Sequence, residues 1–487
     1  MAKTLGFVLG GLGFTLLLIL SDWAYPGGSA PGPSAIRVAA VAFLMAVFWV
    51  TEALPIPATS MLPLVLFPVL GIAPVKNVAP AYADKFILLL MGGFFIALGL
   101  ERWNLHKRLA LRTIVAVGTR PSQLVLGFML AGAGLSMWIS NTATTLMMLP
   151  IALAVLQRVE EKAPGEASGT LGIALLLGIA YACNIGGVGT PIGTPPNLIF
   201  MSQYSVSFPF AAPISFLDWM ITALPIVIVM IVAIWWVLVR GVNRVDDALD
   251  IGDRNAVRND YLALGGLSTP ERRVLVIFGM TALLWVFRKP IVVGEFQLGG
   301  WSNWLGLDGQ VDDGTVAIAA AILMFALPAG NKKGERLLDW ETAVRIPWGL
   351  LLLFGGGLAL AAGFKETGLS AWVGQQLGAL AGLPTWTMIG LVSLSVTFLT
   401  EVTSNTATTT ILMPVLGSVC ETRGIPASHL MLPAAISASC AFMLPVATAP
   451  NAIVFGTGRI RMADMVRIGV VINLIGVVVI TAILSFW

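Results

Sequence analysis

Two copies of one polar hexapeptide stand out as residues able to bind a ligand. Ser140 to Thr145 (Ser-Asn-Thr-Ala-Thr-Thr) return unchanged as Ser404 to Thr409, 264 positions later. Both copies lie in apolar sequence, where uncharged hydrogen-bonding side chains are costly unless they bind one another or a polar ligand. Asn and hydroxyl side chains are able to donate to a carboxylate and also to present oxygens to a hard cation. These hexapeptides, the two polar tips, therefore predict a paired binding site.

Two Gly- and Pro-rich segments accompany the tips. The first, Gly186 to Asn197, interrupts an apolar run, and its Thr-x-Pro-Asn ending from Thr194 recurs from Thr448 at an offset of 254. Such a density of Gly and Pro unwinds a helix. Carbonyls freed in these two breaks, at Gly193 and Ala447, are candidate cation ligands.

The tips and breaks contain no Lys or Arg. Each tip is expected to begin a half-helix, whose free N–H groups and dipole favour an anion by up to about 2 kcal/mol. A bound dicarboxylate would still lack full charge compensation. Cations bound beside it would supply the missing charge, so that each ligand binds well only when the other is present.

The composition indicates a membrane protein. The chain has 487 residues, of which 57% are hydrophobic and 11% charged, with a mean hydropathy of +0.89. Charge-free runs such as Trp219 to Val239 match the roughly 20 residues that a helix needs to cross a bilayer. They are continuously apolar, which disfavours a β-barrel. The net charge of +3 does not favour nucleic acid as a partner.

The spacing of charges predicts an all-α polytopic protein with two hairpins. Residues 121–157 carry no charge, although a polar tip lies at their centre. Two full spans fit this length, but the small, uncharged tip favours a re-entrant hairpin over about 121–158, with a second over about 384–420. The expected parts are a first transmembrane helix and loop (1–35), a first repeat (36–240), a solvated cytoplasmic linker (241–269) and a second repeat (270–487).

The internal repeat also predicts a topology. If each repeat crosses the membrane five times, the odd number inverts the second copy relative to the first. A cytoplasmic N-terminus leaves only seven of the 28 Lys and Arg residues outside, which agrees with the positive-inside rule. These seven are Arg37, Lys76, Lys85, Arg288, Lys289, Lys365 and Arg423.

The paired tips, the two breaks and the early Thr-Glu-Ala-Leu-Pro-Ile-Pro segment from Thr51 together resemble the divalent anion/sodium symporter family, the INDY-like group of dicarboxylate, tricarboxylate and sulfate transporters. The resemblance covers essentially the whole chain. It implies eleven transmembrane helices, two re-entrant hairpins, a scaffold that forms a homodimer, and a transport domain that moves as an elevator.

The resemblance also implies roles for individual residues. The substrate carboxylates would be held by Ser140, Asn141, Thr142, Thr194, Ser404, Asn405, Thr406 and Thr448. Sodium would be held at a first site by Ser136, Ser140, Asn141 and Gly193, and at a second by Thr400, Thr403, Asn405 and Ala447. Thr403 stands where the pattern favours a smaller residue, which puts the second sodium site in question if the side chain at that position takes part.

We therefore expect sodium-coupled uptake of a C4 dicarboxylate such as succinate, malate or fumarate across a bacterial cell membrane. A sodium-independent dicarboxylate exchanger and a citrate- or sulfate-preferring symporter remain alternatives. The sequence contains neither His-Glu-x-x-His nor Gly-x-Ser-x-Gly, which disfavours an enzyme. Glu401, beside the second tip, is expected to support its hairpin by hydrogen bonding rather than to titrate or coordinate an ion.

Overall fold

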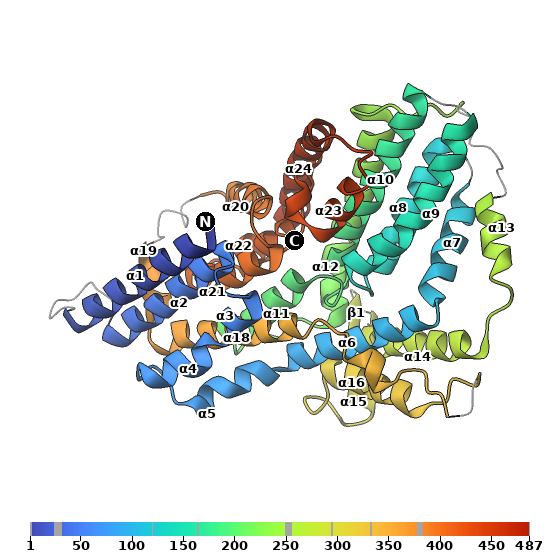
Figure 1. The fold of residues 1–487 in the computed structure, drawn as a ribbon. Coiled ribbons are helices and arrows are strands. Elements are labelled where there is room, and N and C mark those ends of the chain that lie inside the picture. Colours follow the sequence, from blue (N-terminus) through green and yellow to red (C-terminus); the bar gives the residue numbers. More distant parts are fainter. Residues whose placement is uncertain are drawn as a thin grey trace.

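The computed structural model describes residues 2–23, 32–118, 120–162, 165–248, 256–293, 296–331, 334–376 and 383–486. It is helical almost throughout (Figure 1). The first half consists of α1 (Ala2–Trp23), α2 (Pro33–Thr51), α3 (Ile56–Ser60), α4 (Leu62–Val69), α5 (Val75–Val78), the 3-10 turn η1 (Ala79–Ala83), α6 (Lys85–Arg102), α7 (Leu105–Val117), α8 (Pro121–Ser136), α9 (Asn141–Lys162), α10 (Glu166–Gly186), the 3-10 turn η2 (Gly187–Gly189), α11 (Pro195–Ser207), α12 (Phe216–Trp236) and the π-helical turn η3 (Val237–Gly241).

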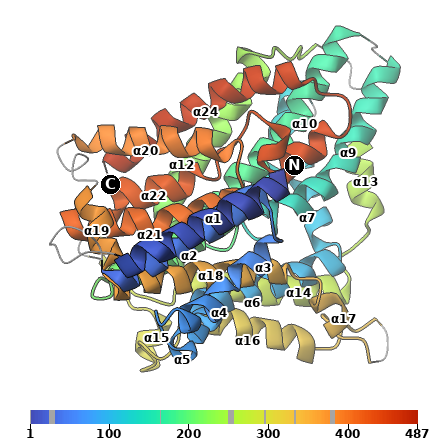
Figure 2. The ribbon, with the colours of Figure 1, turned by 60° about the vertical axis from the view of Figure 1, so that its left-hand side comes forward.

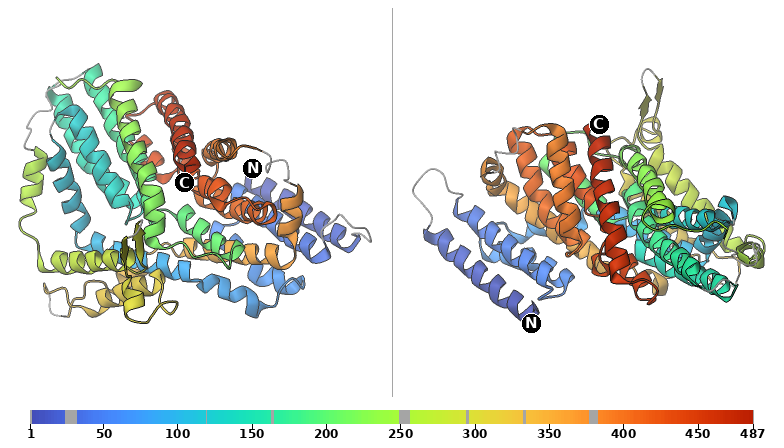
Figure 3. Two further views of the ribbon diagram at one scale, coloured as in Figure 1. Left: turned by 180° about the vertical axis from the view of Figure 1, so that it is seen from behind. Right: turned by 90° about the horizontal axis from the view of Figure 1, so that it is seen from above.

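The second half consists of α13 (Ala256–Ala263), α14 (Thr269–Val286), the strands β1 (Ile291–Val293) and β2 (Phe296–Leu298), α15 (Trp301–Trp304), α16 (Asp313–Ala326), α17 (Trp340–Ala343), α18 (Trp348–Glu366), α19 (Leu369–Gln376), α20 (Thr385–Thr400), α21 (Asn405–Arg423), α22 (Ala427–Ser437), the 3-10 turn η5 (Pro445–Ala447), α23 (Ala449–Phe455) and α24 (Met462–Ser485). Strands β1 and β2 form an antiparallel hairpin that the sequence did not predict, and it projects beyond the helices in the view from above (Figure 3).

Eight helices within the described residues are long and apolar enough to cross a membrane. This confirms the expectation of an all-helical polytopic membrane protein. Shorter apolar helices lie between the long ones, among them α8, α16 and α20. Large apolar side chains are exposed on the long apolar helices, as at Leu12 of α1 and Val478 of α24.

Each polar tip lies in the short gap between two consecutive helices. Helix α8 ends at Ser136 and α9 begins at Asn141, and the two helices lie side by side in Figure 1. In the second half α20 ends at Thr400 and α21 begins at Asn405, with α22 and α24 packed against α20 (Figure 2). The expected helix–tip–helix arrangement is therefore present twice.

The two Gly- and Pro-rich breaks are unwound as the sequence predicted. Helix α10 gives way to η2 and then to an extended Thr190, before α11 starts at Pro195. Helix α22 is likewise separated from α23 by the single turn η5. In both breaks Pro occupies the first turn of the new helix, where its missing N–H leaves no intrahelical bond unmade.

The segment 241–269 is more structured than a solvated loop. It contains α13, and part of it (249–255) lies outside the described residues. Arg108 of α7 forms an ion pair with Glu271 and donates to the carbonyls of Leu264, Gly265 and Gly266. These bonds attach the end of the linker to α7, whereas most of the described linker residues are exposed.

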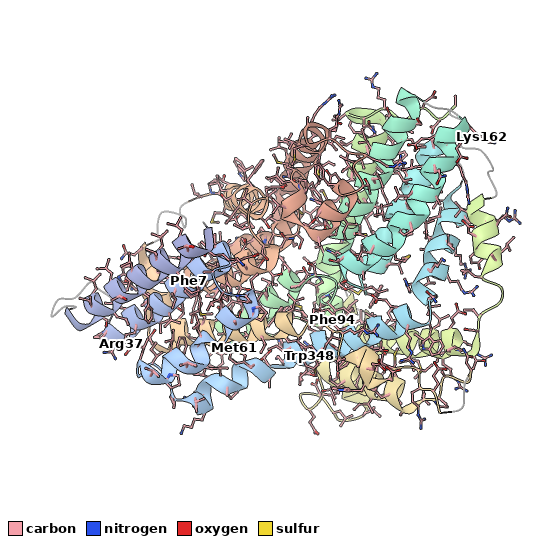
Figure 4. All side chains as sticks on the ribbon, in the orientation of Figure 1. Phe7, Arg37, Met61, Phe94, Lys162 and Trp348 are labelled. Atoms are coloured by element: carbon pink, nitrogen blue, oxygen red, sulfur yellow. The ribbon has the colours of Figure 1, made fainter. Side chains whose placement is uncertain are left out.

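The buried side chains form one large core and two smaller ones, the smallest of which consists of Leu44, Phe48 and Ala53. The large core runs through α6 to α12 and continues into α14, α16 and α20 to α24. The second core joins α2, α4 and α18 around Met45 and Phe67. Arg37 of α2 and Lys162 of α9 lie at opposite ends of the molecule in Figure 4. The tips and breaks lie between these ends.

Candidate functional site

One cavity of about 1030 Å³ brings the two tips and the two breaks together. Phe94, one of its lining residues, lies near the middle of the molecule in Figure 4. All eight residues expected to hold the substrate line the cavity: Ser140, Asn141, Thr142, Thr194, Ser404, Asn405, Thr406 and Thr448. Gly193, Thr403 and Ala447 of the expected sodium ligands also line it. The repeats that are far apart in sequence therefore share one site.

Four helices begin at the tips and breaks that line this cavity. Helices α9 and α21 begin at the tips, and α11 and α23 begin at the breaks. Ser140 and Ser404 cap the first two helices by accepting hydrogen bonds from the backbone N–H three residues on, at 3.2 and 3.5 Å. Since each helix start carries partial positive charge, their convergence favours an anion without any cationic side chain in the tips or breaks.

The first expected sodium site has its oxygens close together. Ser136 Oγ lies within hydrogen-bond reach of two acceptors, Asn141 Oδ1 and, at 2.7 Å, the Cys183 carbonyl oxygen, and its single hydrogen is shared between them. A Cβ placed on Gly187 would lie 2.7 Å from Asn141 Oδ1 and 3.0 Å from the Gly193 carbonyl oxygen. Glycine is therefore required at position 187, because a side chain there would fill the space beside these two oxygens.

The second expected sodium site repeats only part of this geometry. Thr400 Oγ1 donates to Asn405 Oδ1 at 2.6 Å, as Ser136 does to its own asparagine. The hydroxyl of Thr403 instead contacts the Leu399 carbonyl at 2.8 Å and the hydroxyl of Thr408 at 2.7 Å. The side chain of Thr403 is thus bonded within its own tip, and its backbone carbonyl is the group left for a cation.

Two asparagines hold the breaks in shape. Asn197 Nδ2 donates to three carbonyls of the first break, those of Gly187, Val188 and Thr190. Asn451 Nδ2 donates to the carbonyls of Ala441 and Leu444 in the second break. Asn197 and Asn451 match as a repeat in the sequence, but no role was predicted for them. Their signal was the repeated Asn directly after Pro at each helix start.

Glu401 forms hydrogen bonds as the sequence predicted, but it supports the second break and not its own hairpin. Its carboxylate is 3% exposed. It accepts from the backbone N–H groups of Phe442, Met443 and Leu444 at 2.7, 2.9 and 3.0 Å, and from Asn473 Nδ2 at 2.7 Å. Three of these donors face Oε1 and one faces Oε2, so both carboxylate oxygens are used as acceptors. The side chain does not line the cavity, so it orders the break from behind.

Four charged residues line the outer part of the cavity. Lys3, Glu52 and Arg345 are exposed and Glu101 is half-buried. Glu52 adopts a left-handed backbone conformation with φ 48°, which turns the chain at the end of α2. These side chains belong to α1, α2, α6 and the segment before α18, not to the tips or breaks. Two positive and two negative charges leave the rim of the cavity without net charge.

Asn184 is a lining residue that sequence reasoning missed. It lies near the end of α10 and its side chain crosses to the second break, where it bonds Thr448 and Asn451. Its only sequence signal is a polar residue in an otherwise apolar run just before Gly186. Because the position has no polar counterpart in the second repeat, the repeat comparison did not find it.

Solved structures support the fold. YdaH of Alcanivorax borkumensis aligns with a TM-score of 0.54 and 15% identity, over 85% of this chain and 86% of that one. MtrF of Neisseria gonorrhoeae, described as an antimetabolite efflux pump, aligns with a TM-score of 0.57 and 14% identity, over 99% and 94%. At this level of identity the likeness concerns the fold alone.

Sequence comparison gives closer relatives. A sodium-dependent dicarboxylate transporter, SdcS, of Staphylococcus saprophyticus is 41% identical over 490 residues, 99% of this chain and 91% of that protein. SdcS of Staphylococcus aureus strain USA300 is 40% identical over 492 residues, with the same coverage. Residues 11–487 match the model of the sodium:sulfate symporter transmembrane region. With its paired tips and breaks around one cavity, this chain belongs to the sodium:sulfate symporter family, as its resemblance to divalent anion/sodium symporters predicted.

Proposed function

We propose that the protein is a secondary transporter that couples the uptake of C4 dicarboxylates, such as succinate, malate or fumarate, to sodium. The observation that carries this proposal is the cavity lined by both polar tips and both breaks, which together begin four helices and have no cationic side chain. The relatives that are 40 to 41% identical over nearly the whole chain, and are named sodium-dependent dicarboxylate transporters, support it.

The two tips suit a ligand with two separated carboxylates. Ser140, Asn141 and Thr142 hold one carboxylate, and the matching residues of the second tip hold the other. Thr194 and Thr448, the caps of α11 and α23, lie alongside. A compact anion such as sulfate has no second carboxylate for the second tip, so the paired arrangement favours a dicarboxylate over sulfate.

Sodium supplies the positive charge that the tips and breaks lack. At the first site Ser136, Asn141 and Gly193 present neutral oxygens, which suit a hard monovalent cation. Within the described residues no three His, Cys, Asp or Glu side chains lie together as a divalent metal site would require. Because the anion and the cations each lower the electrostatic cost of the other, their binding is coupled, and the sodium gradient drives the acid inward.

The cavity opens toward the cytoplasm in the proposed topology. Lys3 and Arg345 line its outer part, and both lie on the side that the positive-inside rule assigns to the cytoplasm. The conformation is therefore inward-open. The proposed architecture has eleven crossings, arranged as inverted repeats, and two re-entrant hairpins. In the proposed mechanism a dimeric scaffold stays fixed and the transport domain moves as an elevator. The crossings are α1, α2, α3–α4, α6, α10–α11, α12, α14, α16, α18, α22–α23 and α24.

Uptake by the purified protein in liposomes tests this proposal. Labelled succinate is offered outside with an inward sodium gradient, with equal sodium on both sides, or with choline replacing sodium. Accumulation above equilibrium only with the gradient is the expected result. Equal uptake in choline would reject sodium coupling, and exchange against internal succinate under those conditions would identify an exchanger.

A panel of unlabelled competitors tests the substrate class in the same liposomes. Succinate, malate and fumarate should compete strongly, and citrate and sulfate weakly. Stronger competition by sulfate or citrate than by succinate would overturn the assignment to C4 dicarboxylates. A variant that replaces the serine of each tip with alanine serves as the control without transport.

A further inference from the structure

Asn184 crosses from the first repeat to the cavity-lining hydroxyl of the second break. It is 2% exposed, and its Nδ2 group donates to Thr448 Oγ1 at 3.0 Å and to Asn451 Oδ1 at 3.1 Å. Thr448 is the residue that caps α23, and it lines the cavity. A side chain of α10 thus contacts a ligand-binding position of the other repeat directly.

The orientation of the Asn184 amide is fixed by a chain of hydrogen bonds. Asn451 Nδ2 faces the carbonyls of Ala441 and Leu444, which only accept. The Oδ1 atom of Asn451 must therefore face Asn184 and accept a hydrogen bond. Asn184 must donate this bond from its NH₂ group. The same NH₂ group then donates to Thr448 Oγ1. The backbone carbonyls of the second break set the direction of every bond in this chain.

The hydroxyl of Thr448 can therefore only donate a hydrogen bond to a ligand. A hydroxyl accepts two hydrogen bonds and donates one. Thr448 Oγ1 accepts from Asn184 Nδ2 and from the backbone N–H of Asn451, the latter at 3.3 Å. Both acceptor positions are filled, and within the described ranges Thr448 donates to no other residue. Its hydrogen is available to a ligand in the cavity.

The first break has no equivalent device. Thr194 caps α11 without a side-chain hydrogen bond. The position that matches Asn184 at the offset of 254 is Ala438, which has no polar side chain. The two ends of the cavity therefore differ, although their ligand residues are the same.

We propose that Asn184 is a positioning residue that locks the Thr448 hydroxyl as a hydrogen-bond donor, which makes the second-tip end of the cavity selective for an ionised carboxylate. This inference rests on the proposed dicarboxylate transport. A substrate carboxylate accepts a hydrogen bond from the Thr448 hydroxyl. A donor group, such as the NH₂ of an amide, faces this hydroxyl without forming a bond and binds less well.

A double-mutant cycle tests the coupling between the two residues. Asn184→Ala and Thr448→Val should each raise the KM for succinate about tenfold, the usual effect of losing one hydrogen bond to a charged group. The double variant should raise KM no more than Thr448→Val alone, because without the hydroxyl there is nothing left to orient. Effects that multiply in the double variant would overturn the proposal.

Competition by succinamate, in which one carboxylate is replaced by an amide, tests the selectivity. In the wild type succinamate should inhibit succinate uptake much more weakly than succinate itself. Asn184→Ala should narrow this difference severalfold, because the freed Thr448 hydroxyl is then able to accept from the amide. An unchanged ratio of the two inhibition constants would contradict the proposal.

Tyr181→Phe is the matched control. Tyr181 lies one turn before Asn184 and donates from its hydroxyl to the Phe442 carbonyl at 2.6 Å, so it also joins α10 to the second break without touching Thr448. This variant should keep the wild-type KM and selectivity, and a matching rise in its KM would reduce Asn184 to a general packing role. Asn184→Ser replaces the alanine variant if the latter fails to fold. Absence of sodium-driven uptake in the wild type would instead refute the proposed function.

Discussion

Replacement of Glu401 by Gln should loosen the second break. The carboxylate accepts four hydrogen bonds, from Phe442, Met443 and Leu444 of the backbone and from Asn473. A Gln amide retains one acceptor oxygen and adds an NH₂ group that faces a backbone N–H. The change is isosteric, so packing is preserved and only the hydrogen bonding is altered.

The size of the effect follows from the number of bonds. A hydrogen bond to a charged group contributes about 1.5–3 kcal/mol, against about 1 kcal/mol for a neutral one. Three of the four bonds of Glu401 become neutral, and the N–H that meets the new NH₂ loses its partner, which costs about 1–3 kcal/mol. Together these losses should lower the free energy of unfolding by roughly 4 kcal/mol or more. Asn473→Leu removes a single donor and should cost about 1.5–3 kcal/mol.

Thermal unfolding in detergent and sodium titration of uptake measure this effect. Glu401→Gln should lower the unfolding midpoint by several degrees and raise the sodium concentration for half-maximal uptake, because the break also carries the carbonyl of Ala447. Asn473→Leu should show a smaller change of the same kind. Glu421→Gln, which makes the same change in charge at an exposed position of α21, should behave as the wild type. A Glu401→Gln protein with both wild-type values would refute this reasoning.

Three further changes have defined outcomes. Gly193→Ala brings a Cβ within 2.4 Å of a carbonyl oxygen of the first break, so the sodium requirement should rise at least about tenfold, whereas Gly279→Ala, with nothing near its Cβ, should have no effect. Arg108→Met leaves the buried Glu271 without its ion-pair partner and should destabilise the fold by about 3–5 kcal/mol, as measured by thermal unfolding. Ser136→Ala removes the hydroxyl bonded to the asparagine of the first tip and to the Cys183 carbonyl, so it should weaken sodium activation and cost only about 1 kcal/mol of stability.

Each of these three predictions is refuted by a specific result. Normal sodium activation in Gly193→Ala would remove its carbonyl from the proposed first site. Wild-type stability of Arg108→Met would mean that the linker is attached to α7 by other contacts. A large loss of stability in Ser136→Ala would make this hydroxyl a structural group rather than a sodium ligand.

The sequence predicted the parts of the site that are repeated. The two tips, the two unwound breaks and their meeting in one cavity follow from matched polar residues in an apolar chain, because such residues must find partners. The hydrogen-bonding role of Glu401 also followed from the cost of a buried carboxylate, but its partners in the second break did not. Length and hydropathy were enough to predict that the chain spans a membrane.

The sequence did not reveal features that are present only once. The bonds of Asn184 to the second break depend on how α10 packs against the other repeat, and no local pattern encodes this contact. The buried pair of Arg108 and Glu271 joins residues far apart in a stretch that charge alone marks as solvated. The β1–β2 hairpin is too short for its alternation to be distinguished from a loop.

The central claim is that the tips and breaks form a neutral site that binds a dicarboxylate only together with sodium. Equilibrium binding of labelled succinate to the purified protein, in sodium and in choline at equal ionic strength, tests it most directly. We expect saturable binding in sodium, and in choline a dissociation constant at least about a hundredfold higher, as two or more coupled cations imply. The same dissociation constant in both salts would contradict the claim.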